Sequence, residues 1–240
     1  MKKPIIAGIV IMAITSFTFA QAQNVIFETT YLKPKTENLK ELGEKVKAHN
    51  EKYHGEGPYA ASAWQVLTGE RSGLMAWMMG PFTFADLDSR PSEGGHDDDW
   101  MGGVMPLVHG VKDGGYWKMM TDYAYMPSED FVGKIMRVRS FDIKRGKWDE
   151  FFHVMTMIMK VYDEKKLGNS FALLDNWANT GDVDAVIVWQ YENYAYFDGD
   201  LDFAKRYEEV HGDNSWHQFM EAIDDIVVDT SDEMLERMAD

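Results

Sequence analysis

The second half of this chain repeats the pattern of its first half. The segment from Gly69 to Asp88 matches the segment from Gly181 to Asp200 at one constant offset (181 − 69 = 112), with glycines, aromatic residues and aspartates at the same places. Each copy spans about 100 residues, the size of a domain, whereas the units of solenoid proteins span roughly 20–50 residues. The sequence therefore predicts two related halves, residues 23–130 and residues 131–240.

Residues 1–22 have the pattern of a secretory signal peptide. Met1-Lys2-Lys3 is a short basic start, the run from Ile5 to Ala20 is apolar, and Ala20-Gln21-Ala22 supplies the small residues of a cleavage site. A single membrane anchor is the alternative, but the run is short for a span of about 20 apolar residues. No cysteine follows that could carry a lipid anchor. We therefore expect signal cleavage and a periplasmic or secreted mature protein.

Charge and cysteine content exclude several classes of function. The formal net charge is −16, with 40 acidic and 24 basic residues. Phosphate contacts need clustered Lys and Arg, so a nucleic-acid partner is not expected, and neither is an anionic membrane surface. The chain has no cysteine. Thiol catalysis, iron–sulfur clusters and Cys-ligated zinc are therefore excluded.

The hydrophobic pattern predicts the same order of elements in both halves. In the first half we expect a strand over 25–32, a helix over 36–53, strands over 59–67 and 74–79, a helical or irregular stretch over 82–113, and an extended segment over 121–126. In the second half we expect strands over 134–143, 171–177, 183–191 and 226–228, and helices over 147–165, 201–211 and 215–224. The turn Ser128-Glu129-Asp130 also matches Ser231-Asp232-Glu233.

The order β-α-β-β-α-β is that of the ferredoxin-like split unit. Such a unit has helices on one face of an antiparallel sheet, so its other face must be covered by something else, and the second copy can do so. The predicted fold class is therefore α+β, with two tandem ferredoxin-like βαββαβ halves forming an intramolecular dimeric α+β barrel.

With this element order and the duplication over residues 24–233, the chain resembles the dimeric α+β barrel superfamily, as a tandem fusion. It is similar to the NIPSNAP and antibiotic-biosynthesis-monooxygenase groups and, more distantly, to the chlorite dismutase group. No catalytic motif of these families matches residue by residue, so the resemblance assigns no site residue. It implies a pocket in the barrel or between sheet and helices. The superfamily includes cofactor-free oxygenases, haem enzymes and proteins without assigned chemistry, so the fold does not specify a reaction.

The first strands of the two halves carry candidate catalytic residues. Glu28 lies on the first of them, and Arg137 and Arg139 lie on the other. If their faces line the barrel, the arginines would orient an anionic group and Glu28 would transfer a proton. The alternative, which we favour, is that Arg137 pairs with Glu28 and only joins the two halves.

Four histidines are candidates for proton transfer or haem ligation. His49 lies on the apolar face of the helix over 36–53, where it could be a general base or an axial ligand, although a core histidine with one hydrogen bond is commoner. His153, His211 and His217 are further candidate axial ligands. The six-residue spacing of His211 and His217 matches no zinc signature. We predict no metal site, and we favour no cofactor, with haem as the alternative.

The segment from Ser92 to Trp100 is strongly acidic, with three aspartates beside His96. A calcium loop would need alternating oxygen ligands and a following bidentate glutamate, which this run lacks. We therefore expect a solvated, mobile loop, which could also act as a lid over a pocket.

Aromatic and methionine residues are candidates for lining that pocket, although ordinary core packing is the alternative. The expected ligand-binding residues are Trp64, Trp77, Met79, Trp189 and Tyr191. Three functions remain open. The first is binding of a small hydrophobic or aromatic compound, with cofactor-free oxygenation or isomerisation as the reaction if there is one. The second is haem binding, and the third is a non-catalytic interaction scaffold. A homodimer is also possible.

Overall fold

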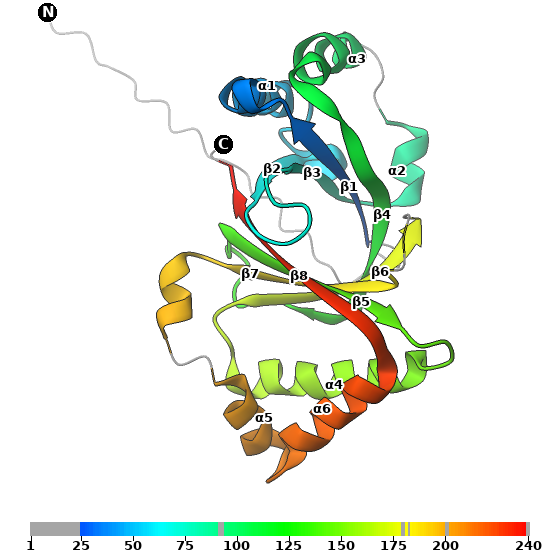
Figure 1. The fold of residues 1–240 in the computed structure, drawn as a ribbon, viewed down its shortest axis with the longest axis vertical. Coiled ribbons are helices and arrows are strands. Elements are labelled where there is room, and N and C mark those ends of the chain that lie inside the picture. The colour runs from blue at the N-terminus through cyan, green and yellow to red at the C-terminus, as the bar shows by residue number, and fades with distance from the viewer. Residues whose placement is uncertain (1–24, 91–93, 179–180, 182, 200–201, 239–240) are drawn as a thin grey trace, which may run out of the picture.

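The computed structural model describes residues 25–90, 94–178, 181, 183–199 and 202–238 (Figure 1). Its strands form one closed antiparallel barrel in the order β1-β3-β2-β8-β5-β7-β6-β4. The strands are β1 (Val25–Pro34), β2 (Ala61–Val66), β3 (Met75–Phe82), β4 (Val108–Tyr125), β5 (Ile135–Ile143), β6 (Ser170–Ala178), β7 (Ala185–Tyr191) and β8 (Val227–Arg237).

Each half supplies four neighbouring strands in the same order. The first half forms β4-β1-β3-β2 and the second half forms β8-β5-β7-β6. The halves join at two seams, where β2 pairs with β8 and β4 pairs with β6. This arrangement confirms the prediction of two ferredoxin-like sheets that face each other within one chain. Both seams are made by this chain, so the barrel closes without a partner subunit.

Helices cover the outside of the barrel at its two ends (Figure 1). The α-helices are α1 (Leu39–Tyr53), α2 (Phe84–Asp88), α3 (His96–Asp99), α4 (Trp148–Lys165), α5 (Phe203–His211) and α6 (Ser215–Ile226). Short 3-10 turns span Thr36–Asn38, Gly57–Tyr59, Met105–Leu107 and Tyr194–Asp198, and a π-helical turn spans Trp100–Val104. In Figure 1, α1 and α3 lie at the top of the view and α4, α5 and α6 lie at the bottom.

Three apolar clusters follow from this layering. The largest packs α4 and α6 on the second sheet, and the apolar side chains of α4 recur every three or four residues, at Phe151, Met155, Ile158 and Tyr162. A second cluster packs α1 on the first sheet through Leu42 and Val46. A third lies inside the barrel. Both faces of each sheet are therefore buried, so strict alternation of apolar and polar residues is not required.

Two predicted elements differ from the structure. The stretch over 82–113 contains only short helices, and β4 already begins at Val108 because backbone pairing with β1 continues through its polar, glycine-rich middle. The closing strand β8 extends to Arg237. Ser128-Glu129-Asp130 lies in the loop after β4, whereas Ser231-Asp232-Glu233 lies within β8, so these two segments are not structural counterparts.

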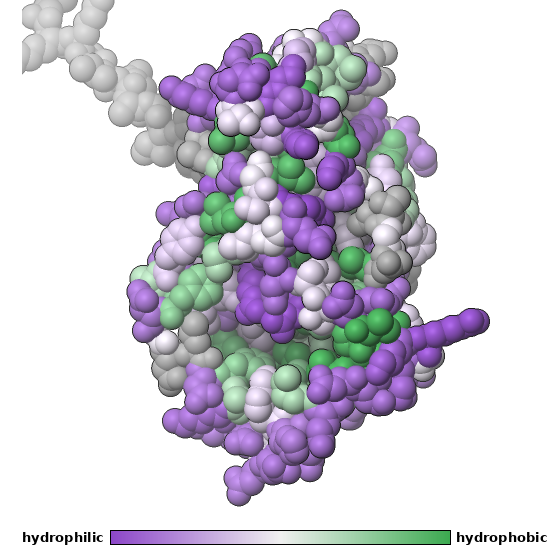
Figure 2. Space-filling model, in the orientation of Figure 1, coloured by the Kyte–Doolittle hydropathy of each residue, from purple (hydrophilic) through white to green (hydrophobic). Residues whose placement is uncertain are grey.

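The predicted signal peptide, residues 1–22, lies outside the described residues. Within the described ranges, no helix combines the length and the apolar character that a membrane crossing would need. On the face shown in Figure 2, hydrophilic residues cover most of the helices at both ends, and hydrophobic residues show mainly where the sheet meets the lower helices.

Candidate functional site

The inside of the barrel holds a cavity of about 630 Å³. Alternate residues of β1 point into it, so Phe27, Thr29 and Tyr31 line the cavity, and Val138 of β5 lines it as well. Its remaining wall is mostly apolar and includes Trp64, Met78, Met79, Trp117, Met119, Met136, Leu174, Val186 and Val188. A cavity of this size and character suits a small molecule, since ligand pockets typically measure about 300–1,000 Å³ and are largely apolar.

One ion pair gives this cavity a polar end. Arg71, from the loop between β2 and β3, donates from Nε and Nη2 to both carboxylate oxygens of Glu233 on β8, over 2.7–3.1 Å. The Glu233 side chain is only 6% exposed and that of Arg71 is 23% exposed. The guanidinium carbon of Arg71 also lies 4.1 Å from the centre of the Tyr31 ring. These three residues form what we call the polar triad.

The Tyr31 hydroxyl is held in its protonated form. Burial raises the pKa of Tyr31 to about 12, and the negative charge of Glu233 acts in the same direction, whereas Arg71 lowers the pKa by a smaller amount. At neutral pH the phenol can therefore donate a hydrogen bond to a molecule in the cavity.

Of the expected ligand-binding residues, Trp64 lines the cavity. Met79 also touches it, but its side chain belongs with that of Trp77 to the cluster packed against α1. Trp77 and Trp189 lie on the outer, helix-facing side of their strands. Tyr191 is buried beside Tyr196, also outside the cavity. Period-two alternation separates the two faces of a strand, but it does not say which face turns inward when both are apolar.

Arg137, Arg139 and Glu28 do not line the cavity, which corrects the expectation that their faces point inward. Arg137 and Arg139 both donate to Asp232 of β8, at 2.9 Å and 2.6 Å. Glu28 accepts from Arg90 instead, at 2.9 Å. The predicted pairing of Arg137 with Glu28 across the halves is therefore wrong. The arginine side chains are more than a third exposed, so these charges stay partly in water instead of being buried in an apolar cavity.

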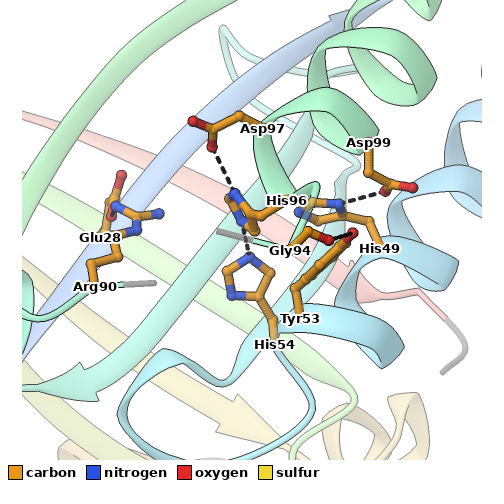
Figure 3. A network of polar contacts seen from close by, with 9 residues as sticks. All are labelled: Glu28, His49, Tyr53, His54, Arg90, Gly94, His96, Asp97 and Asp99. Carbon is orange, nitrogen blue, oxygen red and sulfur yellow. Dashed lines mark hydrogen bonds and ion pairs between the residues drawn. The ribbon is translucent and has the colours of Figure 1, made fainter. Parts of the chain in front are cut away.

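A second group of polar side chains lies outside the barrel, between α1 and α3 (Figure 3). His49, His54 and His96 offer ligand atoms that all lie within 4.8 Å of one another. We call these residues the histidine cluster. The rings of Tyr53, Trp77 and Trp100 surround it, with centroid distances of 5.0–5.2 Å to the nearest imidazole. No member of the cluster lines the barrel cavity.

The acidic segment is held against α1, which corrects the expectation of a solvated loop for its described part, residues 94–100. His96 to Asp99 form α3, and Asp99 accepts a hydrogen bond from His49 at 2.8 Å. This bond holds the pKa of Asp99 below its usual value, and burial lowers the pKa of His49. Tyr53 donates to the carbonyl of Gly94 at 3.2 Å. The N-terminal part of the segment, residues 92–93, lies outside the described residues.

The other candidate histidines lie apart from both groups. His153 is exposed on α4, His211 contacts the carbonyl of Met157 at 2.9 Å, and His217 lies 3.4 Å from Glu221 on the same helix. No histidine in the described ranges lines the cavity. The donor set of the cavity therefore does not fit a haem that is ligated there by histidine.

Sequence reasoning missed four residues of these two groups, namely Tyr31, Arg71, Glu233 and His54. Tyr31 belongs to a predicted strand, Arg71 lies in a turn and Glu233 lies in a segment with no strand pattern, so nothing in the sequence marks them as parts of one buried polar site. His54 follows the last residue of α1. His96 was noted in the acidic run, but its contact with His49 and His54 was not predicted. The five-residue spacing of His49 and His54 was the available signal, but it matches no helical metal motif.

No protein-family model matches this sequence, and no curated protein matches it either. Solved structures do share its fold. A candidate monooxygenase from Lactobacillus acidophilus superposes with a TM-score of 0.62 at 13% identity, over 90% of this chain and 94% of that one. An anthrone oxidase-like protein gives 0.56 at 8% identity, over 92% and 93% of the two chains. A mutant chlorite dismutase from Candidatus Nitrospira defluvii gives 0.54 at 9% identity, over 91% and 93%.

These similarities establish the dimeric α+β barrel fold, in agreement with the resemblance inferred from the sequence. At such low identity, they do not transfer an activity to this chain.

Proposed function

We propose that this protein binds a small hydrophobic or aromatic molecule inside its barrel. The observation that carries the proposal is the largely apolar cavity of about 630 Å³ with the Arg71–Glu233 ion pair at one end. A well-packed protein interior has few voids larger than a water molecule, so a space this large between two sheets is a feature that calls for an occupant. Structures with the same fold include a candidate monooxygenase and a chlorite dismutase, which supports a ligand without identifying it.

The polar triad restricts the chemistry of the ligand. Arg71 is already neutralised by Glu233, so an added anion would have to displace a bidentate carboxylate. The Tyr31 hydroxyl remains a donor, and the carboxylate of Glu233 retains acceptor capacity. A neutral molecule with one hydroxyl or carbonyl group on an apolar body therefore fits better than an anion, which replaces the earlier hypothesis of an arginine clamp.

Binding fits this geometry better than catalysis. Glu28 and His49 lie outside the cavity, whereas Glu233 lines it. A residue that transfers a proton to or from a bound molecule would therefore have to be Glu233. Both oxygens of Glu233 already accept hydrogen bonds from Arg71, so a proton transferred to either oxygen would compete with that ion pair. Cofactor-free oxygenation or isomerisation of the bound molecule remains our proposal for a reaction. Product analysis by mass spectrometry after incubation with dioxygen would test it.

The test of binding uses a variant that fills the cavity. Val138 lines it, and tryptophan in its place would occupy free volume, whereas Val132 is 55% exposed in the loop before β5 and provides the matched control. Nile red, a neutral dye that brightens in apolar sites, is the probe. We expect saturable binding by the wild type and by Val132→Trp, and loss of binding by Val138→Trp with unchanged circular dichroism. Equal binding by both variants would show that the dye lies elsewhere and would refute the proposal.

Native mass spectrometry of the protein purified from its own compartment would identify the natural occupant. From the pattern of residues 1–22 we propose that this compartment lies outside the cytoplasm, and the N-terminus of the mature protein would show whether cleavage occurs after Ala20 or Ala22. The predicted homodimer would need a surface other than the sheet edges, since both seams of the barrel are closed within one chain. Light scattering would show whether the protein is a monomer or a dimer in solution.

A further inference from the structure

The three imidazoles of the histidine cluster each have one nitrogen fixed by an acceptor. Nδ1 of His54 contacts the backbone carbonyl of Tyr59 at 2.8 Å, and a carbonyl oxygen can only accept, so this nitrogen carries the proton. Nδ1 of His96 likewise donates to Asp97 at 2.8 Å, and Nδ1 of His49 donates to Asp99 at 2.8 Å. In each neutral ring the proton is thus on Nδ1 and the lone pair is on Nε2.

The free nitrogens of His54 and His96 face each other. Their Nε2 atoms are 3.0 Å apart, a distance at which two lone pairs repel unless a proton or a cation lies between them (Figure 3). Either a proton shared by the two rings or a metal ion fills the position between them.

His49 distinguishes these two explanations. Its side chain is 1% exposed, and its Nε2 has no hydrogen-bond partner among the described residues. A buried polar nitrogen without a partner costs about 1–3 kcal/mol, and a proton shared by His54 and His96 leaves that cost in place. A metal ion bound by all three rings would remove it. His49 therefore favours the metal.

We propose that His49, His54 and His96 bind one divalent transition-metal ion, with Zn²⁺ as the best match. Imidazole nitrogen suits Zn²⁺, and a hydrogen bond from the second ring nitrogen to a carboxylate or carbonyl is the usual outer shell of such sites. All three rings have that outer shell, through Asp99, Tyr59 and Asp97.

The spacing of the cluster is compatible with a single ion. Two nitrogens 3.0 Å apart, each 2.0–2.1 Å from the ion, would subtend roughly 94° at it. Tetrahedral coordination requires roughly 3.3 Å between ligand nitrogens. The three ligand atoms lie within 4.8 Å of one another, so the widest pair would have to approach by roughly 1.5 Å to reach tetrahedral spacing. Three protein ligands leave a fourth position for water or another ligand.

Such an ion would fasten α3 to the end of α1. His49 lies in α1 and His54 is the residue that follows it, while His96 is the first residue of α3. The cluster lies outside the barrel, so this proposal is independent of ligand binding in the cavity.

The experiment titrates ZnSO₄ into the full mature chain after treatment with EDTA, with calorimetry for stoichiometry. We expect one Zn²⁺ per chain, a higher melting temperature with Zn²⁺, and a visible absorption band of tetrahedral Co²⁺ when CoCl₂ is used. His96→Ala should abolish all three signals. His153→Ala, an exposed histidine on α4, is the matched control and should retain them.

Asp99→Asn tests the outer shell and keeps the proposal testable if the buried variants His49→Ala or His54→Ala fail to fold. Asp99 is 41% exposed, so the variant should fold, and we expect its Zn²⁺ affinity to fall about 10–100-fold. Absence of binding at 100 µM Zn²⁺ would overturn the proposal, as would binding that His96→Ala leaves unchanged. A Nε2–H tautomer of His49 in NMR spectra of the metal-free protein would also overturn it.

Discussion

Arg71 and Glu233 are 162 positions apart in the sequence, yet they form a bidentate ion pair at the seam between the two halves. Arg71 follows β2 and Glu233 belongs to β8, and these are the strands through which the two sheets meet. The pair thus contributes both to the joining of the halves and to the polar end of the cavity.

Removing only one partner of this pair should destabilise the protein strongly. Arg71→Met leaves the carboxylate of Glu233, 6% exposed, without its cation. Breaking a buried ion pair in this way typically costs about 3–5 kcal/mol, and the partial exposure of Arg71 places our expectation near the lower end. The double variant Arg71→Met, Glu233→Leu should recover most of the loss, because no buried charge remains. Urea unfolding of the three proteins measures this, and a double variant no more stable than the single one would contradict it.

Arg137→Met should have a much smaller effect. Arg137 and Asp232 are 38% and 39% exposed, and Arg139 still pairs with Asp232 after the substitution. Partly exposed pairs contribute about 0.2–1 kcal/mol, so we expect a loss below about 1 kcal/mol that shrinks further in 0.5 M salt. The same urea series provides the value. A loss equal to that of Arg71→Met would show that Arg137 has a structural role that its exposure does not suggest.

The element order and the duplication were sufficient to predict the fold, because the longer helices, such as α1 and α4, and most strands have a local hydrophobic period. The α4 stripe of Phe151, Met155 and Tyr162 is one example. The local sequence pattern did not predict the segments whose structure depends on pairing with a strand that is distant in the sequence. The middle of β4, around Lys112 and Gly115, is polar on both faces and is extended because β1 lies beside it.

The polar triad and the histidine cluster were harder to predict than the fold, because each consists of residues that come into contact only after folding. Glu28, Arg137 and Arg139 stood out on the first strands, but a barrel strand buried on both faces does not reveal which face turns inward. His96 and His49 were both noted in the sequence, yet their contact depends on how residues 94–104 fold back on α1. No sequence motif predicts how residues 94–104 fold back on α1.

Alkaline pH should weaken the fold through Tyr31. Its pKa is raised by burial to about 12, whereas it is 10.0 in the unfolded chain. Between these two pKa values Tyr31 is deprotonated in the unfolded state and still protonated in the folded state. Its ionisation therefore does not change the free energy of unfolding below about pH 10, and lowers that free energy as the pH rises towards 12. From pH 9 to pH 11 we expect Tyr31 to account for a loss of about 1 kcal/mol. Tyr31→Phe should show a correspondingly smaller decrease in urea unfolding; an identical decrease would assign the effect to other tyrosines.

A ligand in the barrel should be reported by two tryptophans of the cavity wall, Trp64 and Trp117. Both are less than 10% exposed, so a quencher in solution reaches them poorly, but a ligand inside the cavity lies against them. 4-Bromophenol is a suitable probe, since its hydroxyl group suits Tyr31 and Glu233 and its bromine quenches indole emission on contact. We expect 4-bromophenol to quench the emission of the wild type in a saturable way. 4-Methylphenol, which lacks bromine, should not quench it.

Substitution identifies which tryptophans respond. The double variant Trp64→Phe, Trp117→Phe keeps an apolar wall but should lose the saturable part of the quenching. Trp177→Phe is the matched control, because Trp177 is 54% exposed and lies outside the cavity lining, and it should leave that part unchanged. Arg71→Met should weaken the binding of 4-bromophenol if it still folds, since Tyr31 and Glu233 would lose the guanidinium that positions them. Saturable quenching that persists in the double variant would place the phenol at another tryptophan and would exclude the barrel as its site.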